Sequence, residues 1–284
     1  MPEMPEIETI RRSLEPHIQG RKITSVEVLL PRQIKWPEPE SFVARILQTT
    51  IAGLDRRGKY LLLQLDNQVS LIFHLRMTGQ LVYVPSMGQD NSHHNRLIIH
   101  LDDGSKLIFS DTRTFGTLYA CLYAMHQDEL WRIQGMAELG PEPLSPEFTV
   151  AYLSKAAEGR KTKIKSFLLD QRKVGGLGNI YVDEALFLAG IHPLRQAGSL
   201  TLPELTKLQS TVNQVIAEGI ADGGTTFRDY RNGNGEKGSH QEHLYVYGRD
   251  GQACRICGTL LEKIKVGGRG TRFCPHCQPL EVES

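Results

Sequence analysis

Residues 140–148 read GPEPLSPEF, and this stretch divides the sequence into two regions with different hydrophobic periods. Three prolines and a glycine in so short a run remove backbone donors and oppose both helix and strand. Linkers between domains have this composition, and a chain of 284 residues is long enough for two domains, each with its own core. We therefore expect an interdomain linker over residues 136–148.

The region before the linker has the pattern of a β domain. Short runs rich in branched and aromatic residues, such as YLLLQL (60–65), VSLIFHL (69–75) and KLIFS (106–110), alternate with turn sequences such as DNQ and DDGS. Several strands at this spacing predict a β-sandwich or a barrel. Apolar residues at helical spacing after Pro5 add an N-terminal helix, and we expect this domain to cover residues 2–135.

After the linker the apolar period becomes helical. Segments such as NIYVDEALFLAG (179–190) and LPELTKLQSTVNQVIAEGI (202–220) are bounded by glycine or proline, and they predict a helical domain over residues 149–223. The stretch that follows, GGTTFRDYRNGNGEKGSH, is glycine-rich and polar, which predicts a mobile loop over residues 224–240. A loop of this length is uncommon unless it is functional or disordered.

Four cysteines near the C-terminus have the spacing of a zinc ribbon. ACRIC and FCPHC place Cys254, Cys257, Cys274 and Cys277 in a C-x2-C-x16-C-x2-C pattern. Each C-x2-C pair puts two thiolates on one tight turn, and two such turns complete a tetrahedral site for one Zn²⁺. Because four sulfurs leave no open coordination position, we expect a structural zinc in a finger over residues 241–279. The alternatives are two disulfides or unbound thiols.

Composition and charge restrict the class of protein. The N-terminus lacks the basic-then-apolar pattern of a signal peptide, and no run of about 18 apolar residues is present, so we expect a cytoplasmic protein. The formal net charge is +1, yet residues 155–173 carry seven basic residues against two acidic ones, and residues 254–277 carry five against one. Two basic islands suit a polyanion partner, although two solvated faces explain them equally well.

A glycine-rich turn, VGGLGNIYVDEALF (174–187), leads into a helix between the two basic islands. The free N–H groups of that helix start, with the side chain of Asn179, are suited to hold a phosphate. Taken alone, glycine before a helix is more often only a turn. Its position between basic helices favours DNA binding by a helix-turn-helix-like pair.

The chain opens with MPEMPEIETI, in which one Pro-Glu pair precedes the expected first helix and a second begins it. Pro5 suits the first turn of a helix, and Glu6 suits its positive end. Pro2 and Glu3 have no structural role in this pattern.

These motifs together resemble those of the bacterial formamidopyrimidine-DNA glycosylases. The resemblance is carried by MPEMPEIET, RRGKYLL, HLRMTG, DTRTFG, LGPEPL, GGLGNIYVDEALF, GIHP, GGTTFRDY, the four cysteines and GGRGTRFC, which span residues 2–277 in the family's order. It implies an α+β multidomain fold. The parts would be an N-terminal antiparallel β-sandwich, a helical domain with a helix–two-turns–helix motif, and a C-terminal zinc-ribbon hairpin.

The resemblance also implies a monomeric enzyme of base excision repair, associated with the bacterial nucleoid through DNA binding. Such an enzyme excises oxidised purines, chiefly 8-oxoguanine and formamidopyrimidines, from double-stranded DNA and then cleaves the abasic site by β and δ elimination. Its nucleophile would be the α-amino group of Pro2 once Met1 is removed, with Glu3 as the adjacent acid or base. Lys59 and Arg269 would contact DNA and assist elimination, although a solvated strand-end lysine is an alternative for Lys59.

The other implied roles concern DNA and the damaged base. Met77, Arg113 and Phe115 resemble a wedge that fills the gap left by a flipped nucleotide; without the resemblance, Met77 and Phe115 would be assigned to the core. The implied backbone-contacting positions are His94, Arg160, Lys165 and Asn179. The implied lesion-covering loop, residues 224–240, contributes Thr225, Thr226, Arg228 and Tyr230.

Three positions depart from the family pattern. Met4 stands where leucine is usual, which conserves side-chain volume. The run around His94 reads HHNRL where Lys-His-x-His is frequent, which leaves open whether His93 or His94 carries over. Arg160 replaces a common lysine, so the charge is kept but the geometry differs.

Two other functions remain open on the sequence. An endonuclease VIII-like enzyme has the same fold and amine nucleophile but acts on oxidised pyrimidines; the long loop over residues 224–240 argues against it. A non-catalytic DNA-binding module is the second alternative. The joint presence of Pro2, Glu3 and Lys59 disfavours it, because binding alone needs none of them.

Overall fold

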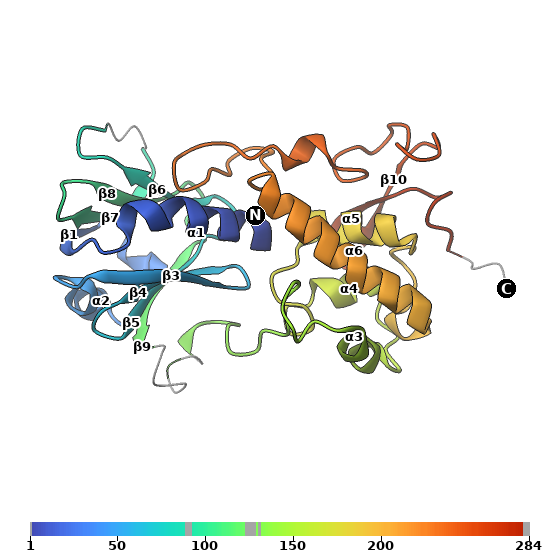
Figure 1. Ribbon diagram of the computed structural model, residues 1–284, viewed down its shortest axis with the longest axis horizontal. Coiled ribbons are helices and arrows are strands. Elements are labelled where there is room, and N and C mark those ends of the chain that lie inside the picture. The colour runs from blue at the N-terminus through green and yellow to red at the C-terminus, as the bar shows by residue number, and fades with distance from the viewer. Residues whose placement is uncertain (1, 89–92, 123–128, 130–131, 281–284) are drawn as a thin grey trace. The chain divides into compact units, whose positions relative to one another are not determined.

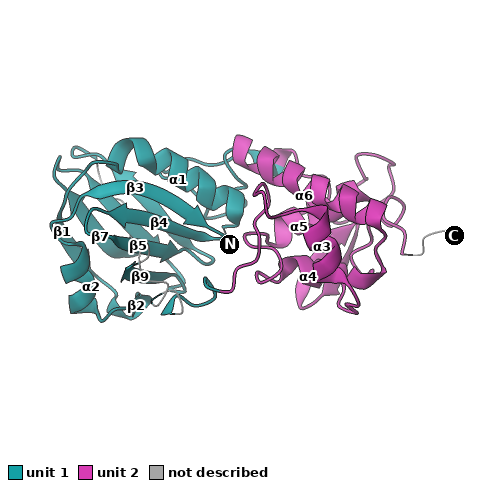
Figure 2. Ribbon diagram, turned by 60° about the horizontal axis from the view of Figure 1, so that its bottom comes forward, with its two compact units in different colours: residues 1–137, 222–241 teal, residues 138–221, 242–284 magenta. Residues whose placement is uncertain are grey.

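The computed structural model describes residues 2–88, 93–122, 129 and 132–280. The chain divides into two compact units (Figure 2). Unit 1 comprises Met1–Ala137 and Asp222–Gln241, and unit 2 comprises Glu138–Ala221 and Glu242–Ser284. The division falls next to the proline-rich stretch, but the segment from Asp222 to Gln241 returns to unit 1 instead of staying with the helices that precede it.

Unit 1 is a β-sandwich of two sheets with an N-terminal helix (Figure 1). One sheet has the strand order β1-β7-β8-β6 and is antiparallel throughout; the other has the order β2-β9-β5-β4-β3. The bounds are α1 Met4–Ile18, β1 Ile23–Val28, β2 Ile34–Trp36, α2 Pro39–Ile46, β3 Ile51–Arg57, β4 Tyr60–Leu65, β5 Val69–His74, β6 Gly79–Val84, β7 Asn95–Leu101, β8 Lys106–Asp111 and β9 Thr117–Leu122. The predicted antiparallel β-sandwich is confirmed, and within it the short edge pair β2–β9 is parallel.

The core of unit 1 lies between the two sheets. Phe73 on β5 and Phe109 on β8 meet with ring centroids 5.9 Å apart, which shows that the sheets face each other as in a sandwich. Every residue of β5 is buried, as expected for a central strand covered on both faces. Helix α1 packs on β3, β4 and β6 through the apolar stripe that begins at Ile7 and Ile10.

Unit 2 is helical and ends in a β-hairpin. Its elements are α3 Val150–Ala157, α4 Ile164–Leu169, α5 Asn179–Ala189, α6 Leu202–Ala221, β10 Glu262–Val266 and β11 Arg269–Phe273. Helix α5 packs against α4, α6 and β11, and it is buried from Ile180 to Phe187 with two acidic residues among them. Gly190, in the left-handed region at φ 74°, ends this helix. Among the described residues, no helix is both long and apolar enough to cross a membrane.

Candidate functional site

The N-terminal arm, Pro2 and Glu3, leads into α1 through a capping box. Pro2 is buried, and Glu3 is the N-cap of α1 with 3% of its surface exposed. The backbone N–H of Glu3 donates a hydrogen bond of 2.8 Å to Oε2 of Glu6, while the Glu3 side chain accepts from the backbone of the same turn. The capping box therefore fixes Glu3 at the start of α1, directly after Pro2.

Glu6 also joins this arm to the segment that returns to unit 1. Its second carboxylate oxygen, Oε1, accepts a 2.8 Å hydrogen bond from the backbone N–H of Thr225, and Glu6 is only 2% exposed. The hydroxyl of Tyr230 donates towards the carbonyl oxygens of Glu6, at 3.3 Å, and Gly223, at 3.1 Å. Sequence reasoning assigned Glu6 only to the helix dipole. The Glu-x-x-Glu spacing signals the capping box, but no local pattern signals the bond to Thr225.

Lys59 lies on the tight turn between β3 and β4, where Gly58 has a φ of 56°. Its side chain is 6% exposed, so a solvated strand-end lysine does not describe it. The same hairpin is tied to α1, because Nε of Arg56 lies 3.3 Å from Oε2 of Glu8 and Nη1 of Arg56 donates to the carbonyl of Gly58 at 3.0 Å. Lys59 is therefore carried by a hairpin that is pinned to the helix beginning next to Pro2.

Glu8 holds three guanidinium groups at this junction. Arg11 and Arg12 lie at 3.0 and 2.7 Å from its Oε1, and Arg56 completes the group. Burial acts to raise the pKa of Glu8, but the hydrogen bonds from Arg11 and Arg12 outweigh it and hold the pKa below its usual value. The carboxylate therefore stays charged and keeps α1 and the Lys59 hairpin together.

His74, at the end of β5, was not among the residues expected from the sequence. It is 7% exposed, its ring meets the ring of Tyr60 edge-on at 4.5 Å, and its Nδ1 accepts from the backbone N–H of Arg76 at 3.2 Å. Burial, followed by the charges of Arg76 and Lys59, lowers the pKa of His74 to about 3. A neutral imidazole within electrostatic range of Lys59 thus belongs to this part of the site. His74 lies in the HLRMTG run of the sequence, but the hydrophobic pattern there indicates only the end of a strand.

Met77, Arg113 and Phe115 form one exposed cluster on two neighbouring loops. Met77 is 45% and Phe115 is 53% exposed, so neither is a core residue. Nη1 of Arg113 lies 3.2 Å from Sδ of Met77, and its guanidinium carbon lies 4.8 Å from the ring centre of Phe115. The backbone N–H of Arg113 also donates to the hydroxyl of Thr78 at 3.0 Å. The structure therefore brings the three sequence-predicted wedge residues together.

The segment around Thr225 is anchored at several points, which does not fit the mobile loop expected from composition. Thr226 donates its N–H to Oε1 of Gln241 at 2.8 Å, and its hydroxyl accepts from the N–H of Gly238 at 3.0 Å. Tyr230 is 9% exposed and joins the hydrophobic core of unit 1, where burial raises the pKa of its hydroxyl far above the ordinary value. Arg228 is exposed.

The far part of the same segment is fixed to α1 and β6. The N–H of Gly233 donates to Oγ of Ser13 at 2.8 Å, and its carbonyl accepts from the N–H of Tyr83, also at 2.8 Å. A side chain at position 233 would collide with Leu14, with an added Cβ only 2.5 Å from that residue's Cγ. Glycine is therefore required by close packing at this point.

In unit 2, the glycine turn before α5 is held by Gln171. Its Nε2 donates to the carbonyl of Leu177 at 2.7 Å, and its Oε1 accepts from the N–H of Gly176 at 3.0 Å, where φ is 89°. Asn179 starts α5, and its Nδ2 donates to the carbonyl of Gly270 in the β10–β11 hairpin at 3.0 Å. The helix N-terminus and the hairpin are thus joined directly.

Of four further residues that the sequence assigns to DNA contact, three are exposed and one is not. His94 lies on the turn before β7, Arg160 follows α3, and Arg269 begins β11 after the two-glycine turn of the hairpin; all three are exposed. Lys165 instead lies inside unit 2 with 0% of its surface exposed. Its ammonium group does not reach the surface in this structure, so a direct contact with DNA is not available to it.

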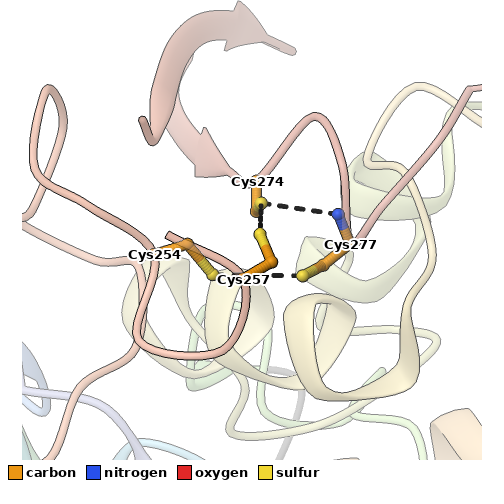
Figure 3. Close-up of side chains that lie close together, drawn as sticks. All are labelled: Cys254, Cys257, Cys274 and Cys277. Atoms are coloured by element: carbon orange, nitrogen blue, oxygen red, sulfur yellow. Dashed lines mark hydrogen bonds between the residues drawn. The ribbon is translucent and has the colours of Figure 1, made fainter. Parts of the chain in front are cut away.

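The four cysteines converge at the end of unit 2 (Figure 3). The sulfur of Cys254 lies 3.9 Å from that of Cys277, the sulfurs of Cys257 and Cys274 are 3.5 Å apart, and all four lie within 4.8 Å of one another. A tetrahedron with zinc–sulfur bonds of about 2.3 Å separates its sulfurs by about 3.8 Å, so the spacing fits one zinc ion. All four cysteines are free thiols, which excludes the two-disulfide alternative.

Hydrogen bonds around the cysteines support the same site. The N–H of Cys277 points to the sulfur of Cys274 at 3.4 Å, and the N–H of Ile256 points to that of Cys254, also at 3.4 Å. Gln278 accepts from the N–H of Cys274 at 3.0 Å and donates to the carbonyl of Ile191 at 2.9 Å, which fixes the knuckle to the end of α5.

The candidate residues fall into two sets. The N-terminal arm, Lys59, the wedge cluster and the segment around Thr225 belong to unit 1, whereas Asn179, Arg269 and the four cysteines belong to unit 2.

Comparison with known proteins covers both units. Three family models match: the formamidopyrimidine-DNA glycosylase N-terminal domain over residues 1–118, the H2TH domain of the same glycosylase over residues 139–231, and a zinc finger found in FPG and IleRS over residues 251–280. The formamidopyrimidine-DNA glycosylase of Symbiobacterium thermophilum is 46% identical over 280 residues, which is 99% of this chain and 90% of the relative.

Two solved structures show the same architecture. A Lactococcus lactis FPG variant in complex with Fapy-dG-containing DNA has a TM-score of 0.89 at 37% identity, covering 98% of this chain and 100% of that one. A MutM complex with DNA containing carbocyclic 8-oxo-G has a TM-score of 0.88 at 37% identity, with the same two coverages of 98% and 100%.

Proposed function

Because the chain belongs to the formamidopyrimidine-DNA glycosylase family, we propose that it excises oxidised purines from duplex DNA and then cleaves the resulting abasic site. The match extends over 99% of the chain, and relatives of the same fold are known in complex with Fapy-dG and 8-oxo-G DNA. The observation that carries the proposal is the Glu6 carboxylate, which ties the Pro2–Glu3 arm to the segment at Thr225.

The nucleophile in this proposal is the nitrogen of Pro2, released as a secondary amine when Met1 is removed. The pKa of an α-amino group is about 8 and that of a lysine is about 10.4, so far more of the α-amine is unprotonated at neutral pH. Its lone pair attacks C1′ and forms an N–C1′ bond while the bond from C1′ to the damaged base breaks. The base leaves with the bonding electrons and takes up a proton. Opening of the sugar ring then gives an iminium, as in other amine-based covalent catalysis.

Strand cleavage follows from the same intermediate. The iminium acidifies the C2′ proton, and loss of that proton breaks the C3′–O bond to the phosphate; a second elimination releases the other phosphate. Glu3 is adjacent to the nucleophile in sequence, which suits it to transfer protons during ring opening. We assign Lys59 and Arg269 to the phosphates of the reacting strand, since each lies on a two-stranded hairpin.

DNA recognition in this proposal uses both units. Met77, Arg113 and Phe115 form an exposed apolar and cationic cluster that suits insertion into a base stack. The N-terminus of α5 at Asn179 suits phosphate binding, and we assign His94 and Arg160 to the backbone as well. A bound Zn²⁺ supplies no reaction chemistry here, because four thiolates would fill its coordination sphere; Cys254, Cys257, Cys274 and Cys277 hold it to fix the hairpin. We place the protein in the bacterial cytoplasm on nucleoid DNA, acting as a monomer.

The test is a comparison of two duplexes under single-turnover conditions, one carrying 8-oxoguanine opposite cytosine and one carrying thymine glycol. We expect excision of 8-oxoguanine opposite cytosine and cleavage of the strand, with little or no excision of thymine glycol. Faster excision of thymine glycol would assign the chain to the endonuclease VIII type. Binding to the 8-oxoguanine duplex without any excision or cleavage product would show that the protein is a non-catalytic DNA-binding module and would contradict the proposal.

A further inference from the structure

A buried ion pair lies beneath the candidate phosphate-binding groups of unit 2. The ammonium nitrogen of Lys165, on α4, lies 2.6 Å from Oδ1 of Asp183, on α5, and both side chains are 0% exposed. The same ammonium group donates to the carbonyl of Gly270, in the β10–β11 hairpin, at 3.1 Å. Lys165 therefore contacts two other elements of the fold and has no exposed surface.

The pair is the centre of a small hydrogen-bonded cluster. Oδ2 of Asp183 accepts from the backbone N–H of Arg272 at 3.1 Å, so each oxygen of this carboxylate has a donor. The carbonyl of Gly270, which Lys165 contacts, also accepts from Nδ2 of Asn179 at 3.0 Å. Both backbone contacts flank Thr271, which is 0% exposed in the middle of β11. The cluster thus attaches one strand, at two points, to the helix that begins with Asn179.

Stability alone does not account for such a pair. Removing two charges from water costs several kcal/mol, roughly what their attraction returns, and well-packed apolar residues of similar volume are often as stable or more stable. A charged pair with fixed directions does supply what apolar packing does not, namely one register between the strand and the helix. Burial raises the pKa of Asp183, while the charge and hydrogen bond of Lys165 act in the opposite direction and favour the ionised carboxylate.

We propose that Lys165 and Asp183 are positioning residues that set the register of the Arg269 strand against the N-terminus of α5. Arg269 and Asn179 then present their groups to one DNA backbone together, with Arg269 one residue before the carbonyl that Asn179 and Lys165 share. The inference rests on the proposed DNA binding of unit 2. It replaces the direct phosphate contact that the sequence suggested for Lys165.

The substitution Asp183→Asn separates the two roles by the sign of its effect. If Lys165 contacted phosphate, removing the neighbouring negative charge would leave affinity for duplex unchanged or raise it. As a positioning pair, Asp183→Asn and Lys165→Met should each weaken binding to undamaged duplex by about tenfold. The matched control is Glu204→Gln, which removes one carboxylate from the Arg195–Glu204 pair, 2.9 Å apart in the same unit; it should bind as the parent does.

A second variant and two further readouts distinguish a loss of register between the strand and the helix from a general folding defect. Lys165→Met combined with Asp183→Leu removes both charges, so it should fold and keep one zinc per chain while its affinity stays about tenfold low. In proton–nitrogen spectra of this variant, the Asn179 side-chain amide and the Arg269 backbone amide should shift or broaden. A double variant that binds DNA like the parent, with those signals in place, would overturn the inference. Because the readout is binding to undamaged duplex, it does not depend on glycosylase activity, which is measured separately in the parent protein.

Discussion

At the scale of single residues, Glu6 links the N-terminal arm to the returning segment of unit 1. One carboxylate oxygen accepts from the N–H of Glu3 and the other from the N–H of Thr225, each at 2.8 Å. An amide at this position keeps one acceptor but turns an NH₂ group towards a buried N–H donor. Such a mismatch costs about 1–3 kcal/mol.

We therefore predict that Glu6→Gln slows excision of 8-oxoguanine by about tenfold or more. Cleavage at a preformed abasic site should fall less, because no base then has to be covered by the segment at Thr225. Single-turnover rates on both duplexes provide the measurement. Glu15→Gln, on the same helix and paired with Arg11 at 2.9 Å, is the control and should change neither rate. Equal losses on the two substrates would show that Glu6 only stabilises the fold.

The buried imidazole of His74 leads to a prediction of how the free energy of unfolding depends on pH. Its pKa is lowered from an ordinary 6.5 to about 3, chiefly by burial, so between these values the unfolded chain binds a proton that the folded one does not. Its contribution to stability is therefore complete above pH 6.5 and is lost as pH falls towards 3. His74→Asn keeps an acceptor for the N–H of Arg76 and does not titrate.

We expect His74→Asn to flatten the acid limb of the stability curve by up to about 1.4 kcal/mol per pH unit. Urea unfolding followed by tryptophan fluorescence is suitable, because both tryptophans of the chain lie in the sequence range of unit 1. Curves for the parent and the variant that stay parallel from pH 7 to pH 4 would mean that His74 is protonated in the folded protein.

The sequence alone identifies the role of some of these residues and not of others. The four cysteines follow from spacing alone, since each pair lies on one local turn. Met77 and Phe115 look like core residues, and only the structure shows them on exposed loops beside Arg113. Lys165 looks like a surface lysine in a basic run, and its burial against Asp183 depends on a partner 18 residues away. Local pattern carries no information about such partners.

At the scale of elements, the returning segment of unit 1 can be shortened while its anchors at Thr226 and Tyr230 are kept. The hydroxyl of Thr226 contacts both the carbonyl of Tyr230, at 3.4 Å, and the N–H of Gly238, at 3.0 Å, so the ends of residues 231–237 lie close together. Two glycines can bridge them. This deletion removes the contacts of Gly233 and keeps Tyr230 in the core.

We predict that this shortened variant loses most of its excision of 8-oxoguanine but retains cleavage of a preformed abasic site. The reason is that a base-covering element is needed only while a base is present. Both activities are measured on the same enzyme preparation. Should the two rates fall together, the segment would be a structural strap of unit 1.

The zinc hairpin gives the second prediction for an element. Cys254→Ser or Cys274→Ser should remove the bound zinc and disorder the β10–β11 hairpin, because three thiolates at this site hold zinc more weakly than four. Metal analysis and DNA affinity should then fall together, since Arg269 lies on that hairpin. Cys121→Ala, in strand β9, is the control and should retain one zinc per chain. A parent protein that is active without zinc would contradict the assignment.

Helices and strands can be predicted from the sequence where the pattern that specifies them is local. The strands, the helices after the linker and the zinc hairpin follow from period, caps and cysteine spacing. The parallel pairing of β2 with β9 does not, because Ile34 and Leu118 are brought together by the topology of the whole sandwich. The loop over residues 224–240 was expected to be mobile from its glycine content, whereas Tyr230 and Gly233 attach it to unit 1.

At the scale of the whole molecule, the chain contributes to unit 1 from two distant parts of its sequence. The first 137 residues form the sandwich, and residues 222–241 return to it after the helices of unit 2. The predicted linker at residues 136–148 indicates one crossing between the units, but no comparable pattern indicates the two later crossings, at Asp222 and after Gln241. The return places Thr225 on the carboxylate of Glu6, and thereby beside the arm that begins with Pro2.

In the proposed mechanism, this arm supplies the nucleophile. Borohydride reduction during reaction with an 8-oxoguanine duplex converts the iminium to a stable amine, and peptide mapping identifies the attached residue. We predict one covalent protein–DNA adduct, located at Pro2 of chains that have lost Met1, and none in a variant that retains Met1. An adduct at Lys59, or an adduct that forms with Met1 in place, would show that the nitrogen of Pro2 is not the nucleophile.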